Sequence, residues 1–208
     1  MAPIARQAAT EIPTEWTLGR AVRHPAAWGL FCVFLFTSSG MFAVTVQVIA
    51  YLVEIGFEPI EAATAWGFSG LLLPVGMILF GWLDGRIGRR TSVFLSYAMS
   101  LSGIGALWLL GHYPSPWLLG AFIVLFGGTT GSRGPLIATI AMNIFRGPNV
   151  GTIFGTISIG AGLGAAFGSW FGGLLHDWNG GYDLVLGWAF FSLLVGQLPF
   201  WIVPSLRR

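Results

Sequence analysis

Six long apolar runs dominate this sequence and restrict what it can fold into. They cover residues 28–53, 63–83, 92–111, 117–143, 150–175 and 184–203. A helix needs about 20 apolar residues to cross the hydrocarbon core of a bilayer, and each run reaches that length. Only 9% of the residues are charged, whereas soluble domains carry about 25%. We therefore expect an all-α membrane protein with six transmembrane helices.

Turn-forming residues separate the runs. The breaks lie at 56–59, 85–90, 113–116, 146–149 and 179–181, where glycine, proline and asparagine interrupt the apolar pattern. We divide the chain into an N-terminal segment 1–26, a six-helix transmembrane region 27–204 and a tail 205–208. Segment 14–23 is either a short amphipathic helix on the membrane surface, capped by Thr17, or a linker with a helical turn.

The basic residues predict how the chain is oriented in the membrane. The sequence has no lysine, and nine of its ten arginines lie in segments that flank the runs: Arg6, Arg20, Arg23, Arg86, Arg89, Arg90, Arg146, Arg207 and Arg208. If the N-terminus is cytoplasmic, all nine are inside and none is outside, as the positive-inside rule requires. We expect both termini in the cytoplasm and a multi-pass protein of the inner or plasma membrane. The same distribution argues against nucleic-acid binding.

The sequence does not predict an enzyme. Ser69 stands in a Gly-Phe-Ser-Gly segment that resembles the nucleophile motif of rhomboid proteases, but the histidines all lie near the ends of runs, out of its reach. Glu61 begins a segment like the coupling loop of ABC permeases, yet the charges place it outside. Cys32 is the only cysteine, and no residues have metal-ligand spacing. We expect no catalytic residue, no metal and no cofactor.

The fifth run carries a regular series of glycines. Residues four apart share one face of a helix, and Gly160, Gly164, Gly168 and Gly172 follow that spacing. In lipid, faces of small residues let two helix backbones approach closely. These glycines predict a helix–helix contact.

Arg133 is the one charge expected deep in the membrane, near the middle of the run 117–143. Such an arginine costs about 2.5–3.5 kcal/mol on insertion scales, so we expect it to face a cavity and not lipid. No acidic residue lies deep in any run, so its partner would be an anionic substrate, a second protein segment or water. A carboxylate can accept two hydrogen bonds from the planar guanidinium. We predict substrate binding by Arg133, with a structural role as the alternative. Gln47 is a second candidate, and its alternative role is an interhelical hydrogen bond.

The segment 81–90 reads Gly-Trp-Leu-Asp-Gly-Arg-Ile-Gly-Arg-Arg and resembles the signature loop of the major facilitator superfamily. The resemblance implies a gating role for its residues Gly81, Asp84, Arg86, Gly88, Arg89 and Arg90. The match departs from the family pattern at one position, because Asp84 stands one place early and Gly85 occupies the usual aspartate position.

Three further segments resemble the monocarboxylate and oxalate/formate-type members of that superfamily. They are the Glu-Trp-Thr-Leu segment 15–18 with His24 and Pro25, the segment 151–155, and the segment 172–182. The resemblance implies the C-terminal six-helix half-bundle of a twelve-helix transporter, with 1–26 as its central loop. In that branch the binding arginine lies on the second helix of this half, where the run 63–83 has none, so its role does not transfer to Arg133.

The resemblance also implies a function. We expect secondary active transport of a small organic anion, such as a monocarboxylate, by alternating access. The implied partners are membrane lipid, the anionic substrate, and either a second six-helix half or a homodimer mate. The alternative is a truncated or non-transporting membrane fragment that needs a partner half.

Overall fold

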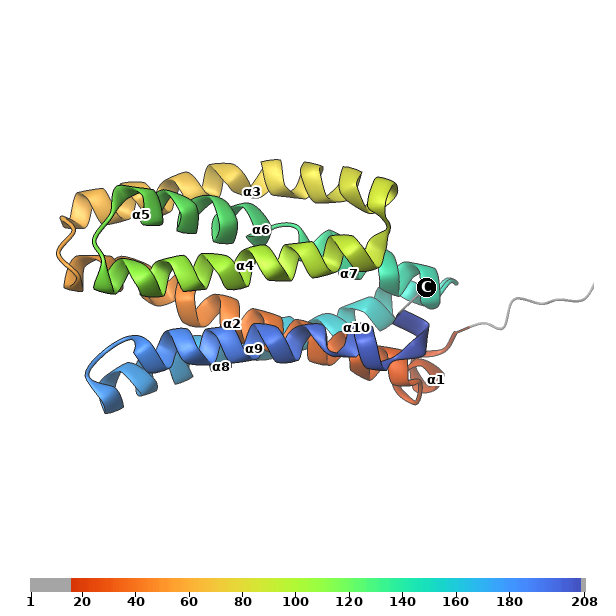
Figure 1. Ribbon diagram of the computed structural model, residues 1–208. Coiled ribbons are helices and arrows are strands. Elements are labelled where there is room, and N and C mark those ends of the chain that lie inside the picture. The colour runs from red at the N-terminus through yellow and green to blue at the C-terminus, as the bar shows by residue number, and fades with distance from the viewer. Residues whose placement is uncertain (1–15, 207–208) are drawn as a thin grey trace, which may run out of the picture.

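The computed structural model describes residues 16–206, and helices make up nearly all of this stretch (Figure 1). Arg6, Arg207, Arg208 and most of the predicted N-terminal segment lie outside the described residues. The long helices are α2 (Pro25–Glu54), α3 (Pro59–Ile87), α4 (Arg89–His112), α8 (Val150–Asn179) and α9 (Asp183–Gln197). The shorter ones are α1 (Leu18–Val22), α5 (Pro116–Phe122), a π-helical turn (Ile123–Gly127), α6 (Gly128–Thr130), α7 (Arg133–Ile144), α10 (Pro199–Ile202) and a 3-10 turn (Pro204–Leu206).

Within residues 16–206, five stretches are long and apolar enough to cross a membrane. They are α2, α3, α4, α8, and α9 together with α10. They overlap the predicted runs except the fourth, which the structure divides into α5, the π-helical turn, α6 and α7. The predicted all-helical fold is therefore confirmed and fits a half-bundle of membrane-spanning helices, whereas the count of six spans and the cytoplasmic termini stay predictions.

Two local predictions are wrong. The break expected over residues 85–90 is a single residue, Gly88, because α3 continues to Ile87 and α4 begins at Arg89. Gly88 has φ 83°, which glycine adopts readily, so one residue is enough to end one helix and begin the next. Thr17 precedes α1, but its side chain makes no capping hydrogen bond. Its backbone carbonyl instead accepts hydrogen bonds from the amides of Arg20 and Ala21.

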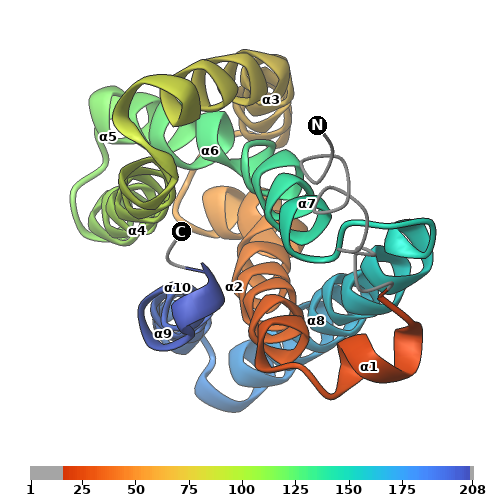
Figure 2. The ribbon, with the colours of Figure 1, turned by 90° about the vertical axis from the view of Figure 1, so that its right-hand side faces the viewer.

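Helix α2 lies at the centre of the bundle (Figure 2), with α8 and α9 on one side and α3 to α7 on the other. All four glycines of the predicted series on α8 are buried. A Cβ atom added to Gly160 would lie 2.7 Å from the carbonyl oxygen of Phe31, and one on Gly172 would lie 2.7 Å from Nε2 of Gln47. Methyl groups on Gly164 and Gly168 would overlap backbone carbonyls of α2. We call this contact between α8 and α2 the glycine seam.

The arginine-bearing segments gather at one end of the bundle. In Figure 1, α1, the turn between α3 and α4, and the connection between α7 and α8 lie at the same end. The connections α2–α3, α4–α5 and α8–α9 lie at the opposite end. The described flanking arginines therefore lie on one side of the bundle, which is the arrangement on which the predicted orientation depends.

Candidate functional site

The middle of the fourth apolar run is irregular, and this irregularity positions Arg133. The run passes from α5 through the π-helical turn into α6, turns at Gly131 and Ser132, and continues as α7 from Arg133. Pro135 lacks an amide hydrogen and cannot bond to the carbonyl of Gly131, and its ring crowds that carbonyl. The helix therefore breaks within one turn before Pro135.

Hydroxyl groups satisfy backbone carbonyls near this break. Thr129 Oγ1 donates to the carbonyls of Leu125 (2.9 Å) and Phe126 (3.0 Å), and Thr130 Oγ1 donates to that of Phe126 (2.9 Å). Ser132 Oγ donates to the carbonyl of Thr129 at 2.8 Å. Irregular backbone at membrane depth is tolerated only where such groups find partners.

The Arg133 side chain lies between α2 and α4 and is only 5% exposed. Its Nη2 donates to the backbone carbonyl of Ser96 (3.0 Å) and to Oγ of Ser100 (2.5 Å). Its Nη1 contacts the sulfur of Met41 at 3.2 Å. The guanidinium carbon lies 4.4 Å from the ring centroid of Tyr97, a favourable position for a cation over an aromatic face. Every one of these partners is uncharged.

Arg133 is a buried cation without a carboxylate partner in residues 16–206, where the ion pairs join His176 to Glu54 and Asp177. Its Nε is buried and has no hydrogen-bond partner in this part of the chain. The adjoining cavity has a volume of about 10 Å³ and is lined in part by Val93, Tyr97 and Phe200, which is room for about one water molecule. The guanidinium is thus only partly satisfied.

A polar stripe on α4 was missed by the sequence reasoning. Ser96 Oγ lies 3.1 Å from Oγ of Ser132, and the hydroxyls of Ser100 and Thr129 are hydrogen-bonded. The Tyr97 hydroxyl lies 2.5 Å from Oγ1 of Thr37 on α2. The spacing of Ser92, Ser96 and Ser100, four residues apart, was a usable signal because it places three hydroxyls on one helix face.

The segment 81–90 is helical except for Gly88, and aromatic rings contact two of its arginines. Arg86 lies over Trp82, 4.6 Å from the ring centroid, and Arg90 lies over Trp201 of α10 at 4.0 Å. Asp84 is half-buried, and its Oδ1 has no hydrogen-bond partner among the described residues. The contact of Arg90 with α10 links the start of α4 to the last helices of the bundle.

Comparison with known proteins identifies the family. A model of the Major Facilitator Superfamily matches residues 75–208, which is more than half of the chain and includes the segment 81–90. This chain belongs to the major facilitator superfamily. Monocarboxylate transporter 12-B of Danio rerio is 24% identical over 176 residues, which cover 84% of this chain and 37% of the relative. The chain is thus similar to a monocarboxylate transporter over most of its own length, and it spans 37% of that relative's length.

As a superfamily member the chain is a multi-pass membrane protein of a transporter family. Within residues 16–206 no cluster of three or more His, Cys, Asp or Glu side chains could hold a metal ion. Gln47, the second predicted site residue, is half-buried on α2 beside Gly172. It lies six residues after Met41 on α2 and does not contact Arg133. Its Nε2 makes no hydrogen bond to any described residue.

Proposed function

We propose that this chain is one six-helix half of a secondary active transporter that moves a small organic anion, such as a monocarboxylate, by alternating access. The observation that carries the proposal is Arg133, a buried guanidinium in a broken transmembrane segment with no carboxylate partner among the described residues. Intramembrane charges of this kind commonly mark substrate or ion pathways. The named activity of the similar Danio rerio protein points to the same substrate class.

Arg133 is the proposed anchor for the substrate carboxylate. A small organic anion does not fit the adjoining cavity of about 10 Å³, so binding requires an opening between α4 and α7. The break at Gly131 and Ser132 is the natural place for that movement, because α7 can tilt there without losing regular helical hydrogen bonds. Gln47, whose Nε2 makes no hydrogen bond to a described residue, is proposed as a second polar contact on the transport path, at a position separate from Arg133. The segment 81–90 is the proposed gating element.

The alternative is that Arg133 is a structural link. Its contacts with Ser96, Ser100 and Met41 tie α7 to α4 and α2, and this arrangement would stabilise the bundle without any ligand. The corresponding alternative for the whole chain is a membrane fragment that does not transport and requires a partner half. The 37% coverage of the relative favours testing the chain both alone and paired.

Uptake by liposomes distinguishes these functions. A central cavity between two six-helix halves needs both walls, so we expect liposomes that contain only monomers to take up no radiolabelled lactate. Liposomes that contain two copies of the chain, or the chain with a second six-helix half, should take up the lactate. The copy number would be measured by single-molecule photobleaching of the same liposomes. Uptake by monomers would contradict the half-transporter proposal, and failure of every paired preparation would favour the non-transporting fragment.

A further inference from the structure

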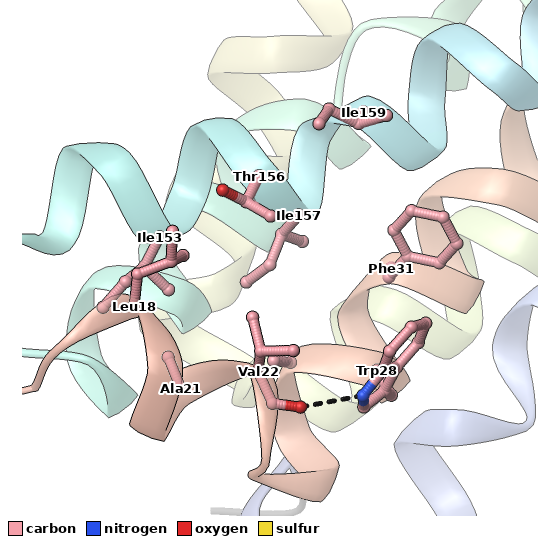
Figure 3. Close-up of a pocket in the computed structure, with 10 residues that line it drawn as sticks. Leu18, Ala21, Val22, Trp28, Phe31, Ile153, Thr156, Ile157 and Ile159 are labelled. Carbon is pink, nitrogen blue, oxygen red and sulfur yellow. Dashed lines mark hydrogen bonds between the residues drawn. The ribbon is translucent and has the colours of Figure 1, made fainter.

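An apolar groove lies at the arginine-bearing end of the bundle, between α1 and the first turns of α2 and α8 (Figure 3). Its volume is about 160 Å³. Val22 of α1, Trp28 and Phe31 of α2, and Ile157 and Ile159 of α8 are among the residues that line it. Neither Arg133 nor any of its partners lines the groove.

The groove offers no free hydrogen-bonding group to an occupant. The indole Nε1 of Trp28 donates to the backbone carbonyl of Val22 at 2.8 Å, as Figure 3 shows. The hydroxyl of Thr156 donates to the carbonyl of Thr152 in its own helix at 2.9 Å. The remaining lining side chains are hydrocarbon. A cavity of about 150 Å³ with such a lining holds a benzene-sized apolar molecule, so the occupant must be apolar.

The depth of the groove matches one leaflet of a bilayer. Helix α8 begins at Val150, and the deepest lining residue on it is Ile159. The lining residues of α8 run from Ile153 to Ile159, which is about 9 Å at about 1.5 Å per residue, and Ile159 lies about 14 Å from the first residue of the helix. Half of a hydrocarbon core that is about 30 Å thick is about 15 Å. An acyl chain lying along α8 would therefore remain within one leaflet.

Three arginines lie on the segments that adjoin the groove. Helix α1 turns Leu18, Ala21 and Val22 toward the groove, while Arg20 and Arg23 are exposed. The connection between α7 and α8 carries the exposed Arg146, and it reaches the start of α1 through a hydrogen bond from Asn149 Nδ2 to the carbonyl of Trp16 (3.1 Å). None of these arginines forms an ion pair within residues 16–206. Arg20 lies over the ring of Trp16, 5.4 Å from its centroid, so no carboxylate in this part of the chain neutralises the positive charge of these arginines.

We propose that this groove binds one acyl chain of an anionic phospholipid, whose headgroup phosphate lies against Arg20 and Arg23. The apolar lining suits an acyl chain, and the depth of the groove keeps that acyl chain within one leaflet. The arginines suit the negative charge of the headgroup. The proposal goes beyond transport and does not depend on it, since it requires only that the chain be embedded in a membrane.

Native mass spectrometry of the purified chain in mild detergent tests this proposal. The protein would be mixed with palmitoyl-oleoyl phosphatidylglycerol or with phosphatidylcholine of the same chains, and bound lipid would be counted. We expect the wild type to retain the anionic lipid preferentially. The double variant Arg20→Gln/Arg23→Gln should weaken retention of phosphatidylglycerol by roughly fivefold for each arginine lost, with little effect on phosphatidylcholine. Both arginines are exposed, so the fold should survive.

Filling the groove tests the site of the acyl chain. Thr156→Phe places a ring in the groove and should reduce retention of both lipids. Thr64→Phe is its matched control. Thr64 is exposed, and its hydroxyl also donates to a carbonyl of its own helix, that of Ile60 (2.6 Å), but it lies on α3, away from the lining of the groove. Arg86→Gln is the control for charge, since it removes one arginine at the same end from a different helix.

Equal retention of both lipids by the wild type would overturn the proposal. The proposal would also be overturned if Thr64→Phe or Arg86→Gln reduced lipid retention as much as its corresponding test variant does. The bound lipid would then lie elsewhere on the bundle. Preferential retention that depends on the two arginines and on the open groove supports it.

Discussion

Arg133 is stabilised inside the bundle by uncharged groups. The ring of Tyr97 lies under the guanidinium, and the Tyr97 hydroxyl is hydrogen-bonded to Thr37 of α2. The aromatic ring therefore supports the arginine and also links α4 to α2. Contacts of this kind between a cation and a ring contribute about 2 kcal/mol or more when both are removed from water. At the residue scale, Tyr97 is therefore part of the proposed site.

Two variants at position 97 separate these contributions. Tyr97→Phe keeps the ring and loses one hydrogen bond, so we expect a loss of about 1 kcal/mol in the free energy of unfolding. Tyr97→Leu loses the ring as well and should cost about 2 kcal/mol more. Reversible unfolding of the purified chain in mixed detergent micelles would measure both. Equal losses in the two variants would show that the ring does not stabilise Arg133.

At the scale of helices, the glycine seam and the broken fourth segment have different origins. The seam is regular, because small residues at every fourth position keep α8 against α2 along several turns. The break arises from Pro135 and from the hydroxyls that satisfy carbonyls around it. One feature holds two helices rigidly together, and the other permits one helix to bend.

The seam predicts a large effect at one glycine and a small effect at its neighbour. A side chain on Gly164 would overlap the backbone of Leu35, whereas a Cβ atom on Gly162 meets nothing within 4 Å. Gly164→Leu should therefore prevent close packing and lower the melting temperature of the purified protein strongly. Gly162→Leu also replaces a glycine of α8 by leucine, and its melting temperature should be close to that of the wild type. Similar melting temperatures for both variants would mean that the seam is misplaced.

Periodic features were predictable from the sequence, whereas partners across space were not. Glycines four residues apart identify a packing face on α8, and the length of the apolar runs identifies the helices. Nothing in the sequence alone says that the seam meets α2, or that Tyr97 lies beneath Arg133, because both depend on how distant segments pack. The π-helical turn also depends on packing between distant segments, because a Cβ atom on Gly103 of α4 would lie 2.9 Å from Phe126 in that turn.

At the scale of the whole molecule, the two ends of the bundle differ in charge. The described flanking arginines lie at one end, together with α1 and the lipid groove proposed above. The other end carries Glu54, Glu58 and Asp177. This asymmetry predicts that the arginine-bearing end is cytoplasmic.

Cysteine labelling in intact cells tests that orientation. Cys32 would first be replaced by alanine, so that each added cysteine reports alone. We expect a membrane-impermeant maleimide to label Glu58→Cys from outside and to label Arg146→Cys only after the membrane is opened. Both positions are exposed in the structure, so access depends on the membrane side. Labelling of position 146 in intact cells would reverse the predicted orientation.

The affinity for a monocarboxylate in membrane vesicles that contain the chain paired with a second copy or a second six-helix half tests the central claim most directly. The lactate concentration at half-maximal uptake would be compared for the wild type, Arg133→Lys and Arg133→Gln, with the exposed Arg146→Gln as the control. Lysine keeps the charge but loses the paired geometry of the guanidinium, and a hydrogen bond to a charged group contributes about 1.5–3 kcal/mol. We therefore predict about a tenfold or greater loss of affinity in both Arg133 variants and none in the control. Unchanged affinity in both Arg133 variants would contradict the account and assign Arg133 a structural role.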